Sequence, residues 1–413
     1  MNEIFDFDKI VDEIHKLYES KYPSKCKPNL KVNEGTIIAS IFTIDEKTKD
    51  TSIITLTSGV KCLNEIDLQR ENVNGWLIHD SHAEILSLRC FNLYLLNLMK
   101  QILTNEEETS FNSIKENQLL QFSRSENKFK WNNQFKIGLY ISQIPCGDCS
   151  ILCEEKEQDI NNQKHEKWED DHMKQYLVPT NKTILRGRNN ISKSGHVRSK
   201  PGRMDSIPSF SKSCTDKLIQ KQSTGITNCL SYDLFDKKQV FLDYLVFPKE
   251  GMTEENEQDV KSCFKRITTS NPFEVVFTNK NFKDALLSIH GNTSLSTNAS
   301  GLMLLKLDVS SNNNNNEYTS QGLQDGVKLG YTTKLKNPLR RNCQSSISRY
   351  EMYKLYLNIK KLKQNDQKKS IENKNYLEFK DSLTERCDLI KCVRELMSPD
   401  GWVKTSKDDF KVL

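Results

Sequence analysis

Hydrophobic and polar positions along the chain repeat with two periods, which predict helices and strands in alternation. Apolar residues recur at helical spacing over 8–22, and a longer apolar helix is predicted to begin near residue 82 and to end near 103. Two more helices are predicted near the C-terminus, at 345–364 and 378–396. Runs of β-branched and apolar residues predict strands at 36–44, 52–57, 134–142, 239–247, 273–278 and 301–309.

This alternation predicts an α/β fold. The chain has no long linker rich in Gly, Ser and Pro, so a single domain over residues 1–413 is expected. Charged stretches without a hydrophobic pattern are expected to be disordered insertions near 105–130, 154–175 and 310–320.

Composition indicates a globular protein, with 28% charged and 36% hydrophobic residues and a net charge of +5. The 12 cysteines are spread from Cys26 to Cys392, which is typical of reduced intracellular thiols. No apolar run approaches the roughly 18–20 residues of a membrane span. The acidic N-terminus lacks the basic region of a secretory signal. We therefore expect a soluble intracellular protein of the nucleus or the cytoplasm, without a membrane partner.

An imidazole and a carboxylate lie two positions apart, at His82 and Glu84, where the longer apolar helix is predicted to begin. Asp80 and Ser81 are candidates for its N-cap, which would place His82 and Glu84 in the first turn. The unpaired N–H groups of that turn would then face the same site.

The segment Pro145–Cys149 reads Pro-Cys-Gly-Asp-Cys. His-x-Glu followed by Pro-Cys-x-x-Cys is the pattern of zinc-dependent nucleobase deaminases. A catalytic zinc ion takes three protein ligands and leaves one position for water, whose pKa it lowers. His82 and Cys146 are predicted as ligands, and Glu84 as the catalytic residue that moves protons. The third ligand is either Cys149, by spacing, or the distant Cys214.

Three ordered motifs resemble the adenosine-deaminase domain shared by double-stranded-RNA editing deaminases (the ADAR family) and their tRNA-acting relatives. These are His-Ala-Glu at 82–84, Pro-Cys-Gly-Asp at 145–148 and Ser-Cys-Thr-Asp-Lys at 213–217. The resemblance extends over nearly the whole chain, through further matches at Gly59–Cys62, Gly225–Ile226 and Gly401–Val403.

The resemblance implies a cytidine-deaminase-like fold, with a mixed β-sheet flanked by helices, long insertions and a C-terminal helical extension. It also implies that Cys214 is the third zinc ligand. Cys149 stays an alternative, because this chain departs from the family there: it has a cysteine where the family usually has another residue.

The segment Lys200–Arg203 resembles the tRNA-acting branch of the family in particular. Only 81 residues precede His82, and they read as part of the core, so no separate double-stranded-RNA-binding domain is expected there. The resemblance therefore implies deamination of adenosine to inosine at position 37 of alanine tRNA, next to the anticodon. Family precedent implies a monomer.

Arg89 lies within the apolar helix, either on an exposed stripe or buried beside an anion. A buried charge needs a partner, and the resemblance names one, inositol hexakisphosphate, enclosed beneath the zinc site. Leu88 and Gln220-Lys221 depart from the family's arginine and Arg-Trp pair. The positions that match the family's cofactor ligands are Arg89, Lys217, Tyr353, Tyr376, Lys380, Trp402 and Lys404.

A basic stretch precedes Cys214, and a cationic loop beside a reactive centre can follow RNA phosphates. The predicted RNA contacts in this stretch are Arg186, Arg188, Lys193, Arg198, Lys200 and Arg203. The resemblance adds Val60 and Lys61 from the substrate-pocket loop. It also adds Thr227, at a position where the editing relatives carry a glutamate that fills the space left by the flipped base.

Three other functions fit parts of the sequence. One is adenosine-to-inosine editing of another structured RNA. The second is a non-catalytic RNA-binding module with a structural zinc ion, which would have four protein ligands. The third is deamination of free nucleosides or of cytosine, against which the large basic loop argues.

Overall fold

The computed structural model describes residues 5–29, 31, 34–68, 73–108, 119–150, 185–186, 195–200, 209–236, 240–285, 294–295, 300–305, 318–331, 339–363, 374–398, 402 and 408–412.

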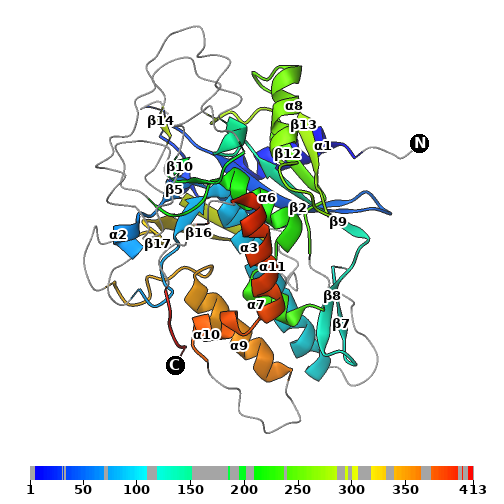
Figure 1. Ribbon diagram of the computed structural model, residues 1–413, viewed down its shortest axis with the longest axis vertical. Coiled ribbons are helices and arrows are strands. Elements are labelled where there is room, and N and C mark those ends of the chain that lie inside the picture. The colour runs from blue at the N-terminus through cyan, green and yellow to red at the C-terminus, as the bar shows by residue number, and fades with distance from the viewer. Residues whose placement is uncertain are drawn as a thin grey trace.

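Within these residues a mixed β-sheet of nine strands forms the centre of the molecule (Figure 1). Its strands are β2 (Ile38–Asp45), β3 (Thr51–Ile53), β4 (Thr55–Ser58), β9 (Phe135–Ile141), β12 (Tyr244–Pro248), β13 (Glu274–Thr278), β15 (Ser300–Leu305), β16 (Tyr318–Gln324) and β17 (Val327–Lys328). Their order is β13-β12-β9-β2-β4-β15-β16-β17, with β3 paired to β2. β12 is parallel to β9 and β13, and the other pairs are antiparallel.

Alternate residues of β2 divide the core into two layers, because successive side chains of a strand point to opposite faces. Ile38 and Phe42 join a cluster with helix α1 (Phe7–Lys21). Ile41 joins the larger cluster around helix α3 (Ala83–Glu108). Burial on both faces explains why all eight residues of β2 are buried.

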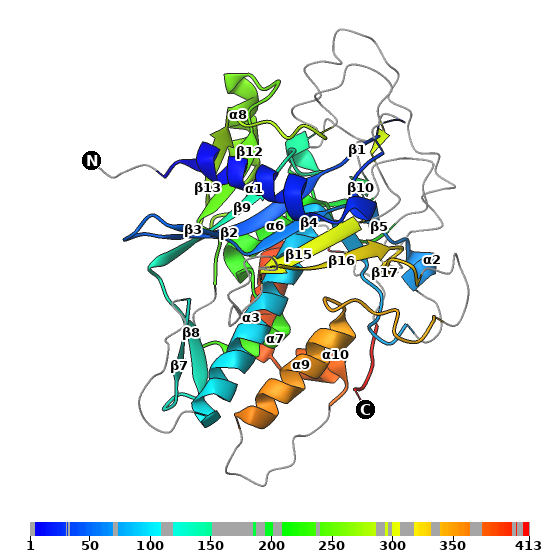
Figure 2. The same cartoon turned by 180° about the vertical axis from the view of Figure 1, so that it is seen from behind.

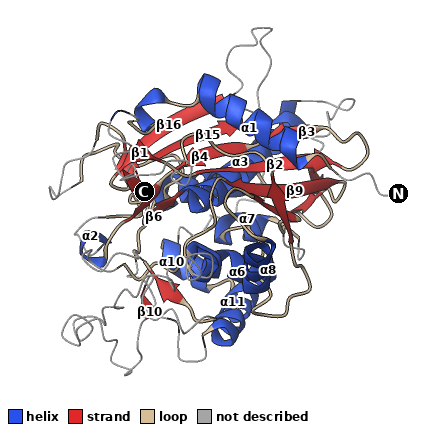
Figure 3. Ribbon diagram, turned by 90° about the horizontal axis from the view of Figure 1, so that it is seen from above, coloured by secondary structure: helices blue, strands red, loops and turns tan. Residues whose placement is uncertain are grey.

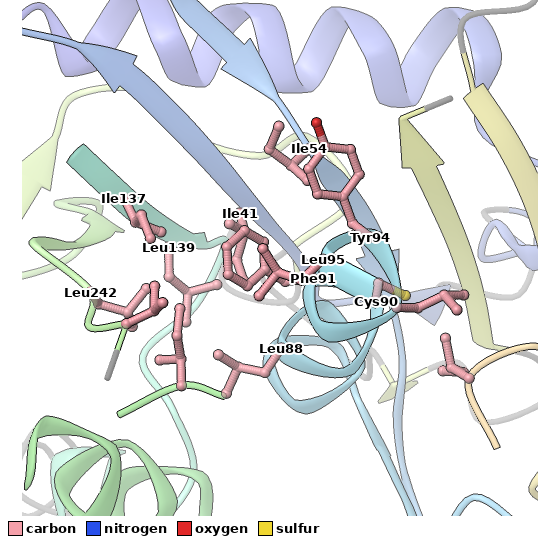
Figure 4. Packing of buried hydrophobic residues seen from close by; sticks show 14 of the residues in the cluster. Ile41, Ile54, Leu88, Cys90, Phe91, Tyr94, Leu95, Ile137, Leu139 and Leu242 are labelled. Atoms are coloured by element: carbon pink, nitrogen blue, oxygen red, sulfur yellow. The ribbon is translucent and has the colours of Figure 1, made fainter. Parts of the chain in front are cut away.

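The helix α3 supplies the centre of the larger cluster. Figure 4 shows Phe91 and Leu95 of this helix beside Ile41 and Leu139 of the sheet. The sequence predicts its end near residue 103, and the structure continues it to Glu108. This long helix therefore connects the sheet with the C-terminal helices.

The remaining helices include α2 (Glu65–Leu68), α6 (Cys214–Thr224), α7 (Cys229–Leu234), α8 (Glu254–Cys263), α9 (Arg349–Leu362), α10 (Tyr376–Asp381), α11 (Thr384–Met397) and the 3-10 turn η1 (Ser24–Cys26). Figure 3 shows α1 on one side of the sheet and α6, α8 and α11 on the other. α9 lies beside α3 (Figure 2), and α11 lies against α6. The predicted C-terminal helical extension is thus packed onto the face of α3. None of the helices in the described ranges is long and apolar enough to cross a membrane.

Four short strand pairs lie outside the central sheet. They are β1 (Glu34–Gly35) with β14 (Ser294–Leu295), β5 (Val60–Cys62) with β6 (Asp80–His82), β7 (Leu120–Ser123) with β8 (Lys128–Trp131), and β10 (Leu185–Arg186) with β11 (Arg198–Ser199). The β5–β6 pair is antiparallel and places Val60 opposite His82.

The structure differs from the sequence prediction in three segments. The helix predicted at 378–396 is interrupted, because Leu383 adopts φ −85° and ψ 68°, outside the helical region. The end of the stretch near 105–130 forms the β7–β8 hairpin, because Phe129 is buried and its ring lies 4.8 Å from that of Phe122. Strand β16 begins within 310–320, and the stretch 154–175 lies outside the described residues.

Candidate metal centre

Three side chains with metal-ligating atoms converge from separate parts of the chain: His82, Cys146 and Cys214. Their ligand atoms all lie within 4.8 Å of one another. His82 Nδ1 lies 3.5 Å from Cys214 Sγ and 4.0 Å from Cys146 Sγ. Ligands of a tetrahedral zinc ion, with bonds of roughly 2.0–2.3 Å, lie about 3.5 Å apart. The donor atoms and their spacing therefore fit one zinc ion.

Local structure brings the two cysteines together. Cys214 is the first residue of α6, whose N-cap Ser213 accepts a hydrogen bond from Asp216 N. The backbone N–H of Cys214 donates to Cys146 Sγ at 3.3 Å. Gly147 has φ +114°, and a Cβ atom there would overlap Ser213 Oγ. The loop after β9 and the start of α6 can approach this closely only because residue 147 is glycine.

The surroundings of Cys146 favour the thiolate form of this side chain. The hydrogen bond from the Cys214 thiol, aided by the charge of Lys200, holds the pKa of Cys146 well below that of a free thiol. Because thiolate is the form that binds metals, this environment favours ligation by Cys146.

The sequence predicts that His82 lies in the first turn of the helix, but in the structure it lies before the helix begins. It ends strand β6, and α3 begins one residue later at Ala83. Asp80 accepts a hydrogen bond from the backbone of His82 at 3.1 Å, a contact within β6 that does not cap the helix. The predicted N-cap role of Asp80 is therefore wrong, because the β5–β6 pairing extends through His82.

Glu84 lies in the first turn of α3 and is 3% exposed. Its charge acts on Cys214, which places the carboxylate beside the group of ligands. Glu84 is not a member of that group. A buried carboxylate beside a metal site, and not on the metal, is the arrangement that a proton-transfer residue requires.

Cys149 is buried but does not join the three ligands. Burial and the neighbouring Cys263 thiol raise its pKa well above that of a free thiol. Burial also raises the pKa of Cys214, so position and not pKa separates the two candidates: the structure brings Cys214 to His82 and Cys146, and places Cys149 apart from them.

A buried carboxylate connects the ligands to two lysines. Lys200 Nζ lies 2.8 Å from Asp80 Oδ2 and 3.0 Å from Cys214 Sγ. Lys217 Nζ bonds the same Asp80 oxygen, and Ser211 Oγ at 2.6 Å. Burial would raise the pKa of Asp80, but Lys200 and Lys217 hold it well below its usual range. Asp80 is therefore an ionised carboxylate that links β6, the strand of His82, to Lys200 and to Lys217 of α6.

Two of the predicted RNA contacts, Arg198 and Lys200, have buried side chains with partners inside the protein, and their contact with RNA stays a prediction. Arg198 is 1% exposed, and its Nε lies 2.7 Å from Asp148 Oδ1. Lys200 is 4% exposed and bonds Asp80 and Cys214. Arg186 belongs to the short strand β10. Arg188, Lys193 and Arg203 lie outside the described residues.

The two predicted pocket residues from β5 lie close to the metal ligands. Val60 is partly exposed and pairs with His82 across the β5–β6 ladder. Lys61 is exposed and forms an ion pair with Asp325, in the turn between β16 and β17. Both therefore remain candidates for the rim of a substrate pocket.

Thr227 is buried, at 1% exposure, and its hydroxyl has no hydrogen-bond partner in the described structure. It lies in the turn from α6 to α7, which is bound to Asn92 of α3 through Ile226 O and Asn228 N. This turn packs against α3, and a contact of Thr227 with RNA stays a prediction.

Beneath the metal ligands, mutually repelling cations gather from α3, α6, α9, α10 and α11. This cationic cluster consists of Arg89, Lys212, Lys217, Lys221, Arg349, Lys380, Arg386 and Arg394. Burial and Arg349 lower the pKa of Arg89 to about 10, and its Nε has no partner in the described structure. Burial and Arg386 lower the pKa of Lys221 to about 7. Lys217 pairs with Asp80 and Arg349 with Asp408. The repulsion among the buried cations of the cluster nevertheless indicates a site for a polyanion.

Sequence reasoning found Arg89, Lys217 and Lys380 of this cluster and missed its other members. Lys221 occupies a position where the chain departs from the family pattern, and the structure nevertheless places it in the cluster. Arg386 and Arg394 are two turns apart on α11. That spacing was the available signal, but it is equally typical of a solvated helix face.

The aromatic residues predicted beside the anion differ in their surroundings. Trp402 lies under Arg394 and Lys212, at 4.8 Å and 5.5 Å from its ring centroid. Tyr376 OH lies 3.4 Å from Cys229 Sγ. Tyr353 OH donates its proton to Lys374 O at 3.0 Å, so the predicted contact with an anion is not supported. Lys404 lies outside the described residues.

Two of three known relatives are similar to this chain over almost its whole length. A tRNA-specific adenosine deaminase 1 of Saccharomyces cerevisiae is 34% identical over 98% of this chain and 95% of its own. The protein of the same name from Schizosaccharomyces pombe is 28% identical, over 93% and 92%. The double-stranded RNA-specific editase Adar of Drosophila melanogaster is 24% identical over 53% of this chain and 30% of its own. Residues 55–401 match the adenosine-deaminase (editase) domain family. The chain therefore belongs to the adenosine-deaminase (editase) domain family.

Proposed function

We propose that this protein is a zinc-dependent hydrolase that deaminates adenosine to inosine in tRNA, at position 37 next to the anticodon of alanine tRNA. The observation that carries the proposal is the convergence of His82, Cys146 and Cys214 beside the buried Glu84. Relatives named tRNA-specific adenosine deaminase 1 align along almost the whole chain, which favours tRNA as the substrate.

A zinc ion held by these three ligands would supply the Lewis acidity that makes water nucleophilic at neutral pH. Glu84 accepts a proton from the water that attacks C6 of the purine. It then delivers protons to the ring nitrogen and to the leaving amine, so that adenosine and water give inosine and ammonia. Lys200 and Asp80 hold Cys214 in place while these protons move.

The geometry favours an enzyme over a module with a structural zinc ion. Structural sites fill all four coordination positions with protein atoms. In the part of the chain that the structure describes, three ligand atoms converge and Cys149 lies apart from them. One position is then left for water.

Inosine in tRNA tests the proposal directly. Purified protein should convert position 37 of an alanine tRNA transcript, read by sequencing, and should leave free adenosine and a regular RNA duplex largely unchanged. A transcript carrying guanosine at position 37 is the matched control. Conversion of free adenosine at an equal rate would contradict the tRNA assignment.

We also propose that the cationic cluster holds inositol hexakisphosphate. Its support is the unpartnered Nε of Arg89, the lowered pKa values of Lys212 and Lys221, both about 7, and the two cations over Trp402. Bringing these cations together costs free energy, which a bound anion would offset. Elemental analysis of dialysed protein should find phosphorus together with zinc, in the ratio of a hexakisphosphate to one ion. Zinc without phosphorus would contradict this assignment.

A further inference from the structure

A second group of buried charges lies behind the metal site, on the side of α8. Asp148 and Asp216 each follow a cysteine ligand by two residues, and both bind the guanidinium of Arg266. Arg266 Nη1 lies 3.1 Å from Asp148 Oδ2, while Nη2 contacts Asp216 Oδ1. The two carboxylates are 5% and 1% exposed. One arginine thus bridges the two segments that carry Cys146 and Cys214.

A second arginine fills the remaining oxygens of this group. Arg198 Nε lies 2.7 Å from Asp148 Oδ1, and its backbone N–H donates to Asp216 Oδ2 at 2.9 Å. Ser213 Oγ donates to that same Asp216 oxygen at 2.6 Å. Each carboxylate is therefore held from two sides, and Arg266 is the member whose side chain contacts both.

We propose that Arg266 is a positioning residue that sets the spacing of the two cysteine ligands and thereby controls how firmly the site holds zinc. The inference rests on the metal site of the proposed function. Arg266 follows α8, which carries none of the three ligands, and it is not a member of the ligand group. Its effect on the metal is exerted through Asp148 and Asp216.

The shape of the guanidinium explains why this position is arginine. A planar fork can bond one carboxylate with each of its two Nη atoms, whereas the ammonium of lysine is a single point charge. Lysine would keep the charge beside the two carboxylates but would not fix the distance between them. Charge and bridging can therefore be separated by substitution.

Other contacts keep the segments folded when the bridge is absent. Thr215 N and Oγ1 both donate to Cys146 O, each at 3.1 Å. Gly147 lies against Ser213. Loss of Arg266 should then loosen the ligand spacing without separating the segments.

The test is the rate at which zinc passes from the holoenzyme to a chelating dye, an observable that does not depend on deamination. Arg266→Gln should release zinc about 10- to 100-fold faster than wild type, the usual cost of losing an outer-shell partner of a metal site. Arg266→Lys should also release it faster, despite its retained charge. Lys265→Gln, at the exposed neighbouring position, should match wild type. Release from both Arg266 variants within twofold of wild type would overturn the proposal.

A double variant distinguishes positioning from general stability. Arg266→Gln with Asp216→Asn removes a buried charge along with its partner, so part of the lost unfolding free energy should return. If Arg266 only stabilised the fold, zinc release would slow again in parallel; if it positions the ligands, release stays fast. If the wild-type protein never forms inosine while the Arg266 variants release zinc faster than wild type, the proposed function fails and this inference stands.

Discussion

Lys200 places its ammonium between the carboxylate of Asp80 and the thiol of Cys214. Burial opposes the charge of Lys200, but Asp80 and Cys214 raise its pKa well above the ordinary value. The charge therefore persists in an enclosed place. It offsets the negative charge that thiolate ligands bring to a metal site, and it connects Cys214 to β6 through Asp80.

Replacing this ammonium should weaken the metal site. Lys200→Met leaves Asp80 with Lys217 and removes the hydrogen bond to Cys214, so we expect zinc affinity to fall about 10- to 100-fold. Competition with a chelating dye measures the change. Lys217→Met keeps the contact to Cys214 and should change zinc affinity less. An unchanged affinity in Lys200→Met would show that the contact to Cys214 does not support the metal.

Glu84 should be needed for chemistry and not for metal binding. Because its carboxylate is beside the ligands and not among them, Glu84→Gln should keep zinc and lower the rate of inosine formation about 10²- to 10⁴-fold. Metal analysis and single-turnover assays with tRNA measure the two properties. Glu46→Gln, at the exposed Glu46 that pairs with Lys136, is the control. Full activity in Glu84→Gln would exclude it as the proton carrier.

At the scale of elements, the metal site joins the end of a short strand, the loop after β9 and the N-terminus of α6. None of these elements carries two of the ligands. The site therefore depends on how closely the loop at Gly147 approaches Ser213, a contact made between backbone and side chain.

Glycine 147 should be sensitive to any side chain. Gly147→Ala combines an unfavourable φ of +114° with overlap on Ser213 Oγ, so it should lower the unfolding free energy by about 1–3 kcal/mol and speed zinc release. Gly251→Ala is the matched control, because Gly251 has φ +70° with open space around it. It should cost only the backbone strain, and zinc release should not change. Equal zinc release in both variants would contradict the role of the close approach.

Sequence periodicity was sufficient for the strands and long helices, because the apolar residues of the core repeat with the period of each element. Local motifs were sufficient to indicate His82 and Cys146, which the structure brings together with Cys214, and the role of Glu84 stays a prediction. Sequence reasoning failed where contacts between residues distant in the chain determine the local structure. The β5–β6 pairing moved His82 out of the helix, and Asp148 buried Arg198 in what reads as an exposed basic stretch. The choice of Cys214 over Cys149 needed the resemblance, because spacing alone favours the nearer residue.

At the scale of the whole molecule, the cationic cluster connects the helices under the sheet. Arg349 of α9 lies against His79, in the segment before the metal ligand, and 3.4 Å from Asp408 near the C-terminus. Asp408 also accepts from Gly75 N at 3.0 Å. Arg349, a member of the cationic cluster, thus also makes contacts that hold the C-terminal segments in place.

The stability of protein freed of its anion should rise with pH. Burial lowers the pKa of Lys221 to about 7, against 10.5 for an ordinary lysine. Between these values the unfolded chain binds one proton more than the folded chain at this residue, so the unfolding free energy increases with pH across this window. An anion restores the charged form of Lys221 and should flatten the dependence.

Thermal unfolding of phosphate-free protein between about pH 7 and pH 9 measures this dependence. Lys221→Met should reduce the slope, and Lys265→Met, at an exposed position, should keep it. Unfolding midpoints of the freed wild-type protein that fall as pH rises across this window would contradict the lowered pKa of Lys221.

The order of the chain also sets an order of events during synthesis. All three metal ligands have been synthesised by residue 214, whereas α9, α10 and α11 follow from residue 349 onwards. At roughly 5–20 residues per second, the ribosome needs on the order of 10–40 s to proceed from Cys214 to the end of α11. The zinc ligands are therefore synthesised before α9, α10 and α11, which complete the cationic cluster proposed to bind the anion. Loading should follow translation, with the metal first and the polyanion last, and a supply of inositol hexakisphosphate in the translating cell would decide the yield of folded protein.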